Sequence, residues 1–124
     1  MDFVAIDFET ATSKRDSPCA IGIAYFKSGE LLDWKFQLIR PKENRFDWFN
    51  TAMHGIDEKE VKDEPEFPEI WPELKAALSS GIAIAHNAGF DFSVLRHTLN
   101  LYQIPFPEVE YFCTRIMAAK AWPE

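Results

Sequence analysis

The sequence has few cysteines, no long apolar segment and no excess of basic residues, and each absence excludes a class of protein. Cys19 and Cys113 are the only cysteines among 124 residues, which excludes a secreted scaffold held together by several disulfides. Two reduced, largely buried thiols in a cytoplasmic protein are the interpretation we favour. No apolar run approaches the ~20 residues of a membrane-spanning helix.

The formal net charge of −7 restricts the partners of the chain. A broad basic face for following duplex DNA is excluded by this charge. A small pocket that holds one nucleic-acid end around metal ions is still compatible with it, because the ions would supply the positive charge. Apolar residues make up 47% of the sequence, which is enough for a packed core.

The hydrophobic pattern predicts a single α/β domain over residues 1–124, with a mixed sheet covered by helices. Three strands form an antiparallel meander, and alternating helices and strands follow. In the third strand, alternate apolar residues are expected to face the core. A connection over 41–68 is too long to lack structure, so we expect short helical turns in it. The expected strands are 3–8, 19–26, 31–39, 82–85 and 109–113, and the expected helices are 68–79 (or 72–79), 90–102 and 115–121.

The first strand, FVAIDFET (Phe3 to Thr10), ends in two acids spaced two residues apart. Side chains two apart on a strand point the same way, so Asp7 and Glu9 share one face. Carboxylates that close need a shared proton or counter-charge, and a divalent cation such as Mg²⁺ or Mn²⁺ is the natural one. Considered alone, the pair has a simpler explanation, in which Glu9 is solvated and Asp7 caps a loop.

A second group of residues, HNAGFDFSVL, runs from His86 to Leu95. Helical spacing places Asp91 beside the apolar stripe of Phe92 and Leu95, so it points inward. An acid in a first helical turn can also simply stabilise the helix N-terminus. However, ligand sites in open α/β sheets form at the carboxyl ends of strands, and Asp91 follows the end of one strand while Asp7 ends another. If these strands are neighbours, three acids converge, which suits a metal pair for phosphoryl transfer.

FVAIDFET and HNAGFDFSVL resemble the first and second motifs of the DEDD (DEDDh-type) superfamily of 3′→5′ exonucleases. MHGI (Met53 to Ile56) resembles an element of the branch that includes the DNA polymerase III epsilon proofreading subunit. The resemblance covers nearly the whole chain and implies a ribonuclease H-like fold. It also implies an enzyme that hydrolyses nucleic acid from the 3′ end to nucleoside monophosphates.

The resemblance further implies a role for each matching residue. Asp7, Glu9 and Asp91 would be the catalytic acids and would hold two Mg²⁺ or Mn²⁺ ions: Asp7 bridging both, Glu9 binding one and Asp91 supporting the second. Thr10 and His54 would contact the terminal nucleotide, and Phe90 would pack against it. An ordinary turn histidine before Gly55 is the alternative for His54.

The family's third motif, a histidine followed by an aspartate, is not found after Asp91. The histidine is the family's general base and the aspartate its fourth metal ligand. We therefore expect a chain truncated before this motif, with its C-terminal helical part missing, weak or no activity, and a tendency to form homodimers. A non-catalytic module that binds nucleic acid or a polymerase is the alternative. The residues do not distinguish DNA from RNA, nor proofreading from stand-alone repair or RNA turnover.

Overall fold

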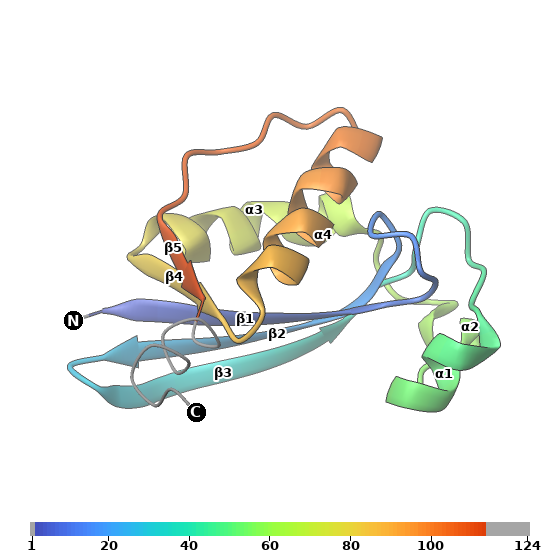
Figure 1. Cartoon of the computed structure of the whole chain (residues 1–124), viewed down its shortest axis with the longest axis horizontal. Coiled ribbons are helices and arrows are strands. Elements are labelled where there is room, and N and C mark those ends of the chain that lie inside the picture. Colours follow the sequence, from blue (N-terminus) through green and yellow to red (C-terminus); the bar gives the residue numbers. More distant parts are fainter. Residues whose placement is uncertain (1, 114–124) are drawn as a thin grey trace, which may run out of the picture.

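The structure is a computed structural model that describes residues 2–113, and a five-stranded mixed sheet lies at its centre (Figure 1). Its spatial order is β3-β2-β1-β4-β5, so β1 is the middle strand. β1 is antiparallel to β2 and parallel to β4, β2 is antiparallel to β3, and β4 is parallel to β5. The strands are β1 (Phe3–Thr10), β2 (Pro18–Lys27), β3 (Glu30–Leu38), β4 (Ile82–Ala85) and β5 (Tyr111–Cys113).

Two helices, α3 (Phe67–Ser79) and α4 (Ala88–Leu101), cover one face of the sheet (Figure 1). Two short helices, α1 (Trp48–His54) and α2 (Glu58–Val61), lie beyond the end of the sheet to which β1 runs. The predicted helical turns in the long connection are thereby confirmed. At the start of α2, Asp57 accepts hydrogen bonds from the amides of Lys59 and Glu60, as an N-cap residue does.

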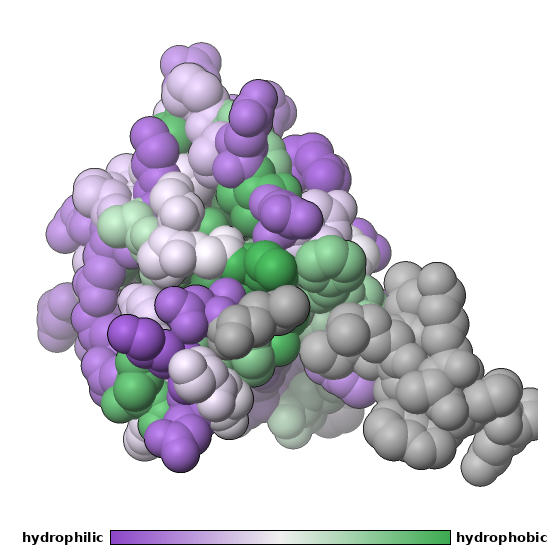
Figure 2. All heavy atoms as spheres, turned by 90° about the vertical axis from the view of Figure 1, so that its left-hand side faces the viewer, coloured by the Kyte–Doolittle hydropathy of each residue, from purple (hydrophilic) through white to green (hydrophobic). Residues whose placement is uncertain are grey.

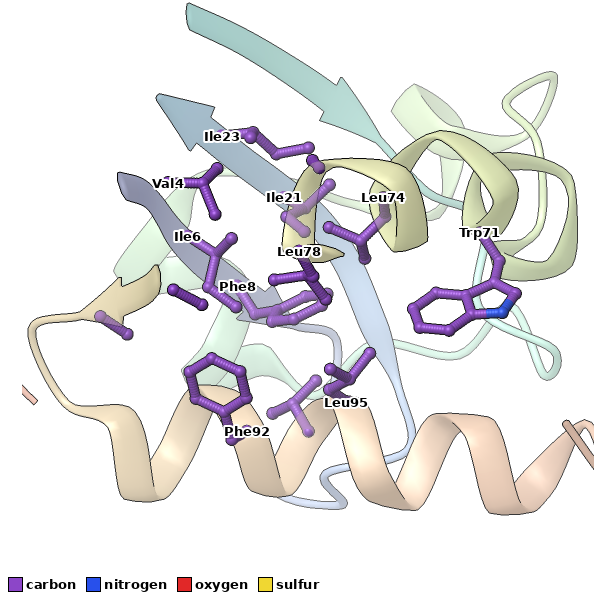
Figure 3. Packing of buried hydrophobic residues seen from close by; sticks show 14 of the residues in the cluster. Val4, Ile6, Phe8, Ile21, Ile23, Trp71, Leu74, Leu78, Phe92 and Leu95 are labelled. Atoms are coloured by element: carbon purple, nitrogen blue, oxygen red, sulfur yellow. The ribbon is translucent and has the colours of Figure 1, made fainter. Parts of the chain in front are cut away.

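The core lies between the sheet and the two covering helices, and its largest side chains come from β1, β2, α3 and α4 (Figure 3). Val4, Ile6 and Phe8 point into it from alternate positions of β1. Figure 3 shows Leu74 and Leu78 of α3 directed toward this cluster from the opposite side. Because the even positions of β1 face this core, the odd positions, Asp7 and Glu9 among them, lie on the other face of the sheet.

The expectation that alternate apolar residues of the third strand face the core is wrong. Leu32, Trp34 and Phe36 are 63%, 66% and 58% exposed. Trp34 is in register with Ala24, and Phe36 with Gly22, on the face that does not carry α3 and α4. Leu38, the fourth residue of that series, is half buried and packs against a smaller apolar cluster around Cys19 and Ile56. The alternation does mark a strand with one apolar side, but β3 is an edge strand and that side faces away from the covering helices.

Figure 2 views the end of the sheet at which β1 begins and shows apolar residues at the surface there, between polar ones. Leu31, Tyr111 and Phe112 are among the exposed large apolar residues of the two edge strands, β3 and β5. None of the helices within residues 2–113 combines the length and apolar composition that crossing a membrane requires. The helix expected over 115–121 lies outside the described residues.

Candidate active site

The two acids of β1 lie on one face of the sheet, as the sequence predicts. Asp7 is exposed and Glu9 is half buried, while their neighbours Phe8 and Thr10 are buried on the opposite face. Burial raises the pKa of the Asp7 carboxyl above its ordinary value. The pKa of Glu9 is raised by burial and then by the charge of Asp7, while His54 lowers it. The two carboxylates are therefore close enough to repel each other.

Asp91 lies against the backbone between these two acids. Its carboxylate Oδ1 accepts a hydrogen bond from the Phe8 amide over 2.8 Å, and its side chain is only 3% exposed. β4 pairs with β1 only from Phe3 to Ala5, so the Phe8 amide has no strand partner on that side. The carboxylate of Asp91 accepts this amide where β4 no longer pairs with β1. This satisfies a buried donor that would otherwise destabilise the fold by about 1–3 kcal/mol.

The pairing of β1 with β4 brings Asp91 close to the end of β1. β1 and β4 run parallel side by side, so their carboxyl ends lie at the same edge of the sheet. β4 ends at Ala85, and α4 begins three residues later, with Asp91 in its first turn. The prediction that strand neighbourhood brings Asp91 to the end of β1 is confirmed.

The electrostatics of Asp91 reflect this position. Its pKa is raised to about 6, first by burial and further by the charges of Asp7 and Glu9. The hydrogen bond from the Phe8 amide opposes the rise because it favours the ionised form. Three carboxylates therefore act on one another at the end of the central strand, and a positive charge among them would relieve their repulsion.

The chemistry of these donors fits a hard divalent cation, because such ions prefer carboxylate oxygens. Within residues 2–113, however, no three His, Cys, Asp or Glu side chains lie close enough together to hold a metal ion as they stand. The three acids are thus close enough to interact electrostatically, but their side chains are not arranged as a complete set of metal ligands.

The end of β1 is held by residues of the long connection, in and just before the short helix α1. The side-chain Nδ2 of Asn50 donates to the carbonyl oxygens of Thr10 and Thr12, each over 3.2 Å, and lies 3.4 Å from the Thr10 hydroxyl. The amide of Asp47 donates to the Ala11 carbonyl over 2.9 Å. Thr10 is consequently buried, and its backbone is fixed next to Glu9.

His54 also contributes to this support. Its Nε2 donates to the Thr10 carbonyl over 2.8 Å, and its Nδ1 accepts the amide of Ile56 over 3.1 Å. Gly55 adopts a positive φ of 77° directly after it, which ends α1 and turns the chain back. Because both ring nitrogens are engaged within the protein, a contact of His54 with a nucleotide would use the edge or face of the ring.

Phe90 lies at the start of α4, half buried against the core. The guanidinium carbon of Arg15 lies 5.6 Å from the centre of its ring. A nucleotide that packs against Phe90 would therefore meet a cation as well as an apolar ring.

Sequence reasoning missed the supporting residues Asn50, Asp47 and Arg15. Asn50 and Asp47 belong to the connection for which only short helical turns were expected, and Arg15 belongs to the loop after β1. No local pattern marks them, because each acts through a contact with a segment distant in the sequence.

The mixed sheet covered by α3 and α4 is a fold that solved nuclease structures share, among them the nuclease domain of a DEDDh family member. The sequence model of the Exonuclease family (RNase_T) matches residues 4–124, and the chain belongs to this family.

Curated relatives include two bacterial polymerases. The DNA polymerase III PolC-type of Clostridium perfringens is 29% identical over 100 residues, and that of Caldanaerobacter subterraneus subsp. tengcongensis is 31% identical over 97 residues. These stretches cover 79% and 77% of this chain, and the chain spans only 7% of either relative. The 3′-5′ exonuclease DinG of Staphylococcus epidermidis is 24% identical over 123 residues, which cover 85% of this chain and 14% of DinG.

Two solved structures show the same fold. Exonuclease X in complex with 5′ overhanging duplex DNA superposes with a TM-score of 0.78 at 26% identity, covering 98% of this chain and 64% of that one. The nuclease domain of 3′hExo, a DEDDh family member bound to rAMP, has a TM-score of 0.81 at 16% identity. That match covers 96% of this chain and 69% of the nuclease domain.

Proposed function

We propose that residues 1–124 form an exonuclease domain that removes nucleotides from the 3′ end of a single-stranded or frayed DNA or RNA. One observation carries the proposal: the Asp91 carboxylate accepts the amide of Phe8, between Asp7 and Glu9, in a chain of the Exonuclease family. The products would be nucleoside monophosphates, as the resemblance to the DEDD motifs implies.

Asp7, Glu9 and Asp91 would hold the divalent metal, which we propose to be a pair of Mg²⁺ or Mn²⁺ ions. Bound there, the ions would polarise a phosphoryl oxygen and make a water more acidic. The residues of this chain would position the acids and the terminal nucleotide. The rigid end of β1 fixes two of the acids, the hydrogen bond to Phe8 fixes the third, and Thr10, His54 and Phe90 would contact the terminal nucleotide.

We propose that these 124 residues alone are weakly active or inactive. The one histidine after Asp91 is His97, in the middle of α4, where its Nδ1 donates to the Ser93 carbonyl over 2.7 Å. A base that is missing from a hydrolytic site typically lowers the rate by about 10²–10⁴. A polypeptide that also carries the His and Asp of the third motif would then be more active.

The apolar surface of β3 supports a proposal about self-association. Trp34 and Phe36 line an apolar depression with Ala5, Asp7, Gly22 and Ala24, next to the acids. We propose that a second copy of the chain covers this surface, so that the 124 residues form a homodimer at high concentration.

The named relatives suggest a cellular context. Because two of them are polymerases, we propose a DNA polymerase as a partner, with roles in DNA replication or repair. Cys19 and Cys113 are thiols and are not joined in a disulfide, which suits a cytoplasmic protein.

The test is the digestion of 5′-labelled single-stranded DNA and RNA in Mg²⁺ or Mn²⁺ by these 124 residues, by the full-length gene product and by its Asp7→Ala variant. If the full-length product carries the third motif, we expect it to shorten the strands stepwise from the 3′ end, with little shortening by the 124 residues and none by the variant. Equal activity of the full-length product and its Asp7→Ala variant would refute the mechanism. Tight oligonucleotide binding without digestion would favour the non-catalytic module.

A further inference from the structure

The loop that follows β1 is rigid and presents its tip to solvent. Ser17 accepts the amide of Thr12 over 3.1 Å and donates to the carbonyl of Lys14 over 2.6 Å. Ala11 donates its amide to the Ser17 carbonyl over 2.8 Å. The base of the loop is buried, whereas Lys14 and Arg15 at its tip are exposed. The loop therefore carries two exposed cations on a hydrogen-bonded backbone a few residues beyond Glu9.

Arg15 turns toward the start of α4. Its Nη1 donates to the Gly89 carbonyl over 3.4 Å, and its guanidinium lies over the ring of Phe90 at 5.6 Å. Gly89 and Phe90 directly precede Asp91 in the first turn of α4. Arg15 thus joins the two segments that carry the candidate acids, and it lies at the side of the site where Phe90 is half exposed.

Within residues 2–113, no ion pair involves Arg15. The ion pairs there are Lys35 with Glu73, Arg40 with Glu66 and Arg45 with Asp47. Arg15 instead contacts a carbonyl oxygen and an aromatic ring. A guanidinium has five N–H donors in one plane, so a single bond to Gly89 leaves the others for an anion.

A nucleic-acid strand that approaches Asp7, Glu9 and Asp91 brings phosphates toward three carboxylates. A strand can bind there only if cations offset the repulsion, and the chain as a whole carries a net charge of −7. Arginine suits this role because its planar donors match two oxygens of a phosphate at once.

We propose that Arg15 binds a backbone phosphate of the strand whose 3′ end enters the site, with its guanidinium oriented by the ring of Phe90. This inference rests on the proposed exonuclease function. Arg15 would then set the affinity for the strand while the three acids set the rate of hydrolysis.

The experiment measures the binding of a 5′-fluorescein-labelled dT 12-mer by anisotropy in EDTA over a series of NaCl concentrations. It compares the wild-type chain with Arg15→Ala, Arg15→Lys and Arg96→Ala. Arg96 is a matched control, because it is an exposed arginine on α4 whose guanidinium likewise lies near an aromatic ring, 5.5 Å from the centre of the Phe106 ring. Circular dichroism checks that each variant is folded.

We expect Arg15→Ala to bind about ten-fold more weakly, as the loss of one charged hydrogen bond to a phosphate would cause. The slope of log K against log salt concentration should become less negative by about 0.7, which is the contribution of one phosphate contact on a single strand. Arg15→Lys should keep most of the salt slope but lose part of the affinity, and Arg96→Ala should match the wild type.

The inference is overturned if the wild-type chain does not bind the 12-mer, or if Arg15→Ala and Arg96→Ala have the same affinity and salt slope. Failure of the proposed function looks different. The Arg15 effect on binding would be present, yet the full-length gene product would release no nucleotides in Mg²⁺ or Mn²⁺. If it does release them, Arg15→Ala should raise KM about ten-fold and leave kcat nearly unchanged.

Discussion

Replacing Asp91 by asparagine should make the metal-free protein more stable at neutral pH, although it removes a proposed metal ligand. The Asp91 carboxyl is almost completely buried, and its pKa is raised from the ordinary 3.8 to about 6 by burial and by the charges of Asp7 and Glu9. The asparagine of the variant would have no charge to bury, and its amide oxygen can still accept the hydrogen bond from the Phe8 amide.

The sign of the effect follows from the two states of the chain. Below about pH 3.8 the carboxyl is protonated in both the folded and the unfolded protein. Between about pH 4 and 6 the unfolded chain ionises first, so the free energy of unfolding falls as the pH rises. Above pH 6 the loss is complete, and a rise in pKa from 3.8 to about 6 corresponds to about 3 kcal/mol at 1.36 kcal/mol per pKa unit.

The assay is urea unfolding of the wild type and Asp91→Asn in EDTA at several values between pH 3.5 and 8, followed by circular dichroism. The difference between their free energies of unfolding should grow by about 3 kcal/mol in favour of the variant over this range. Asp63→Asn serves as the control, because Asp63 is an exposed carboxylate in the loop after α2. Its difference from the wild type should stay nearly constant.

Parallel pH profiles for the wild type and Asp91→Asn would refute the reasoning, because they would mean that Asp91 ionises equally easily in both states. A variant that becomes less stable relative to the wild type as the pH rises would refute it more strongly. That result would show that the folded protein stabilises the charge of Asp91, so that no repulsion would be left for a metal ion to offset.

Two further predictions concern residues around the acids. Asn50→Ala should lower the free energy of unfolding by about 1–3 kcal/mol, because the carbonyls of Thr10 and Thr12 lose a donor, and unchanged urea unfolding would contradict this. Trp34→Lys should abolish homodimers, since it places a charge on the exposed apolar side of β3, and sedimentation equilibrium over a concentration series would show it. A wild-type chain that stays monomeric up to millimolar concentration would contradict the dimer proposal.

The sequence predicts the parts of the site that local periodicity controls. A period of two places Asp7 and Glu9 on one face of β1, and a period of 3.6 turns Asp91 inward on α4. Their convergence additionally needs β1 and β4 to be neighbours, a condition that the sequence leaves open and that the parallel pairing of the two strands fulfils.

Other features depend on tertiary contacts that no local pattern contains. The alternation in β3 marks an apolar side but does not say which face of the sheet the helices cover, so the expectation that Trp34 and Phe36 face the core is wrong. The sequence allows α3 to start at Pro68 or at Pro72. The helix begins at Phe67 and keeps Pro72 inside it, although Pro72 cannot donate to the carbonyl of Pro68. Burial of Phe67, Trp71 and Leu74 offsets the lost bond.

The most direct test of the site is the binding of Mn²⁺ to the purified chain, followed by electron paramagnetic resonance at pH 7.5. If the three acids hold the metal together, the wild type should bind Mn²⁺, and Asp7→Asn, Glu9→Gln and Asp91→Asn should each weaken binding at least about ten-fold. Asp63→Asn should bind as the wild type does. A dissociation constant for Asp91→Asn equal to that of the wild type would contradict the account, because Asp91 would then be only a structural partner of the Phe8 amide.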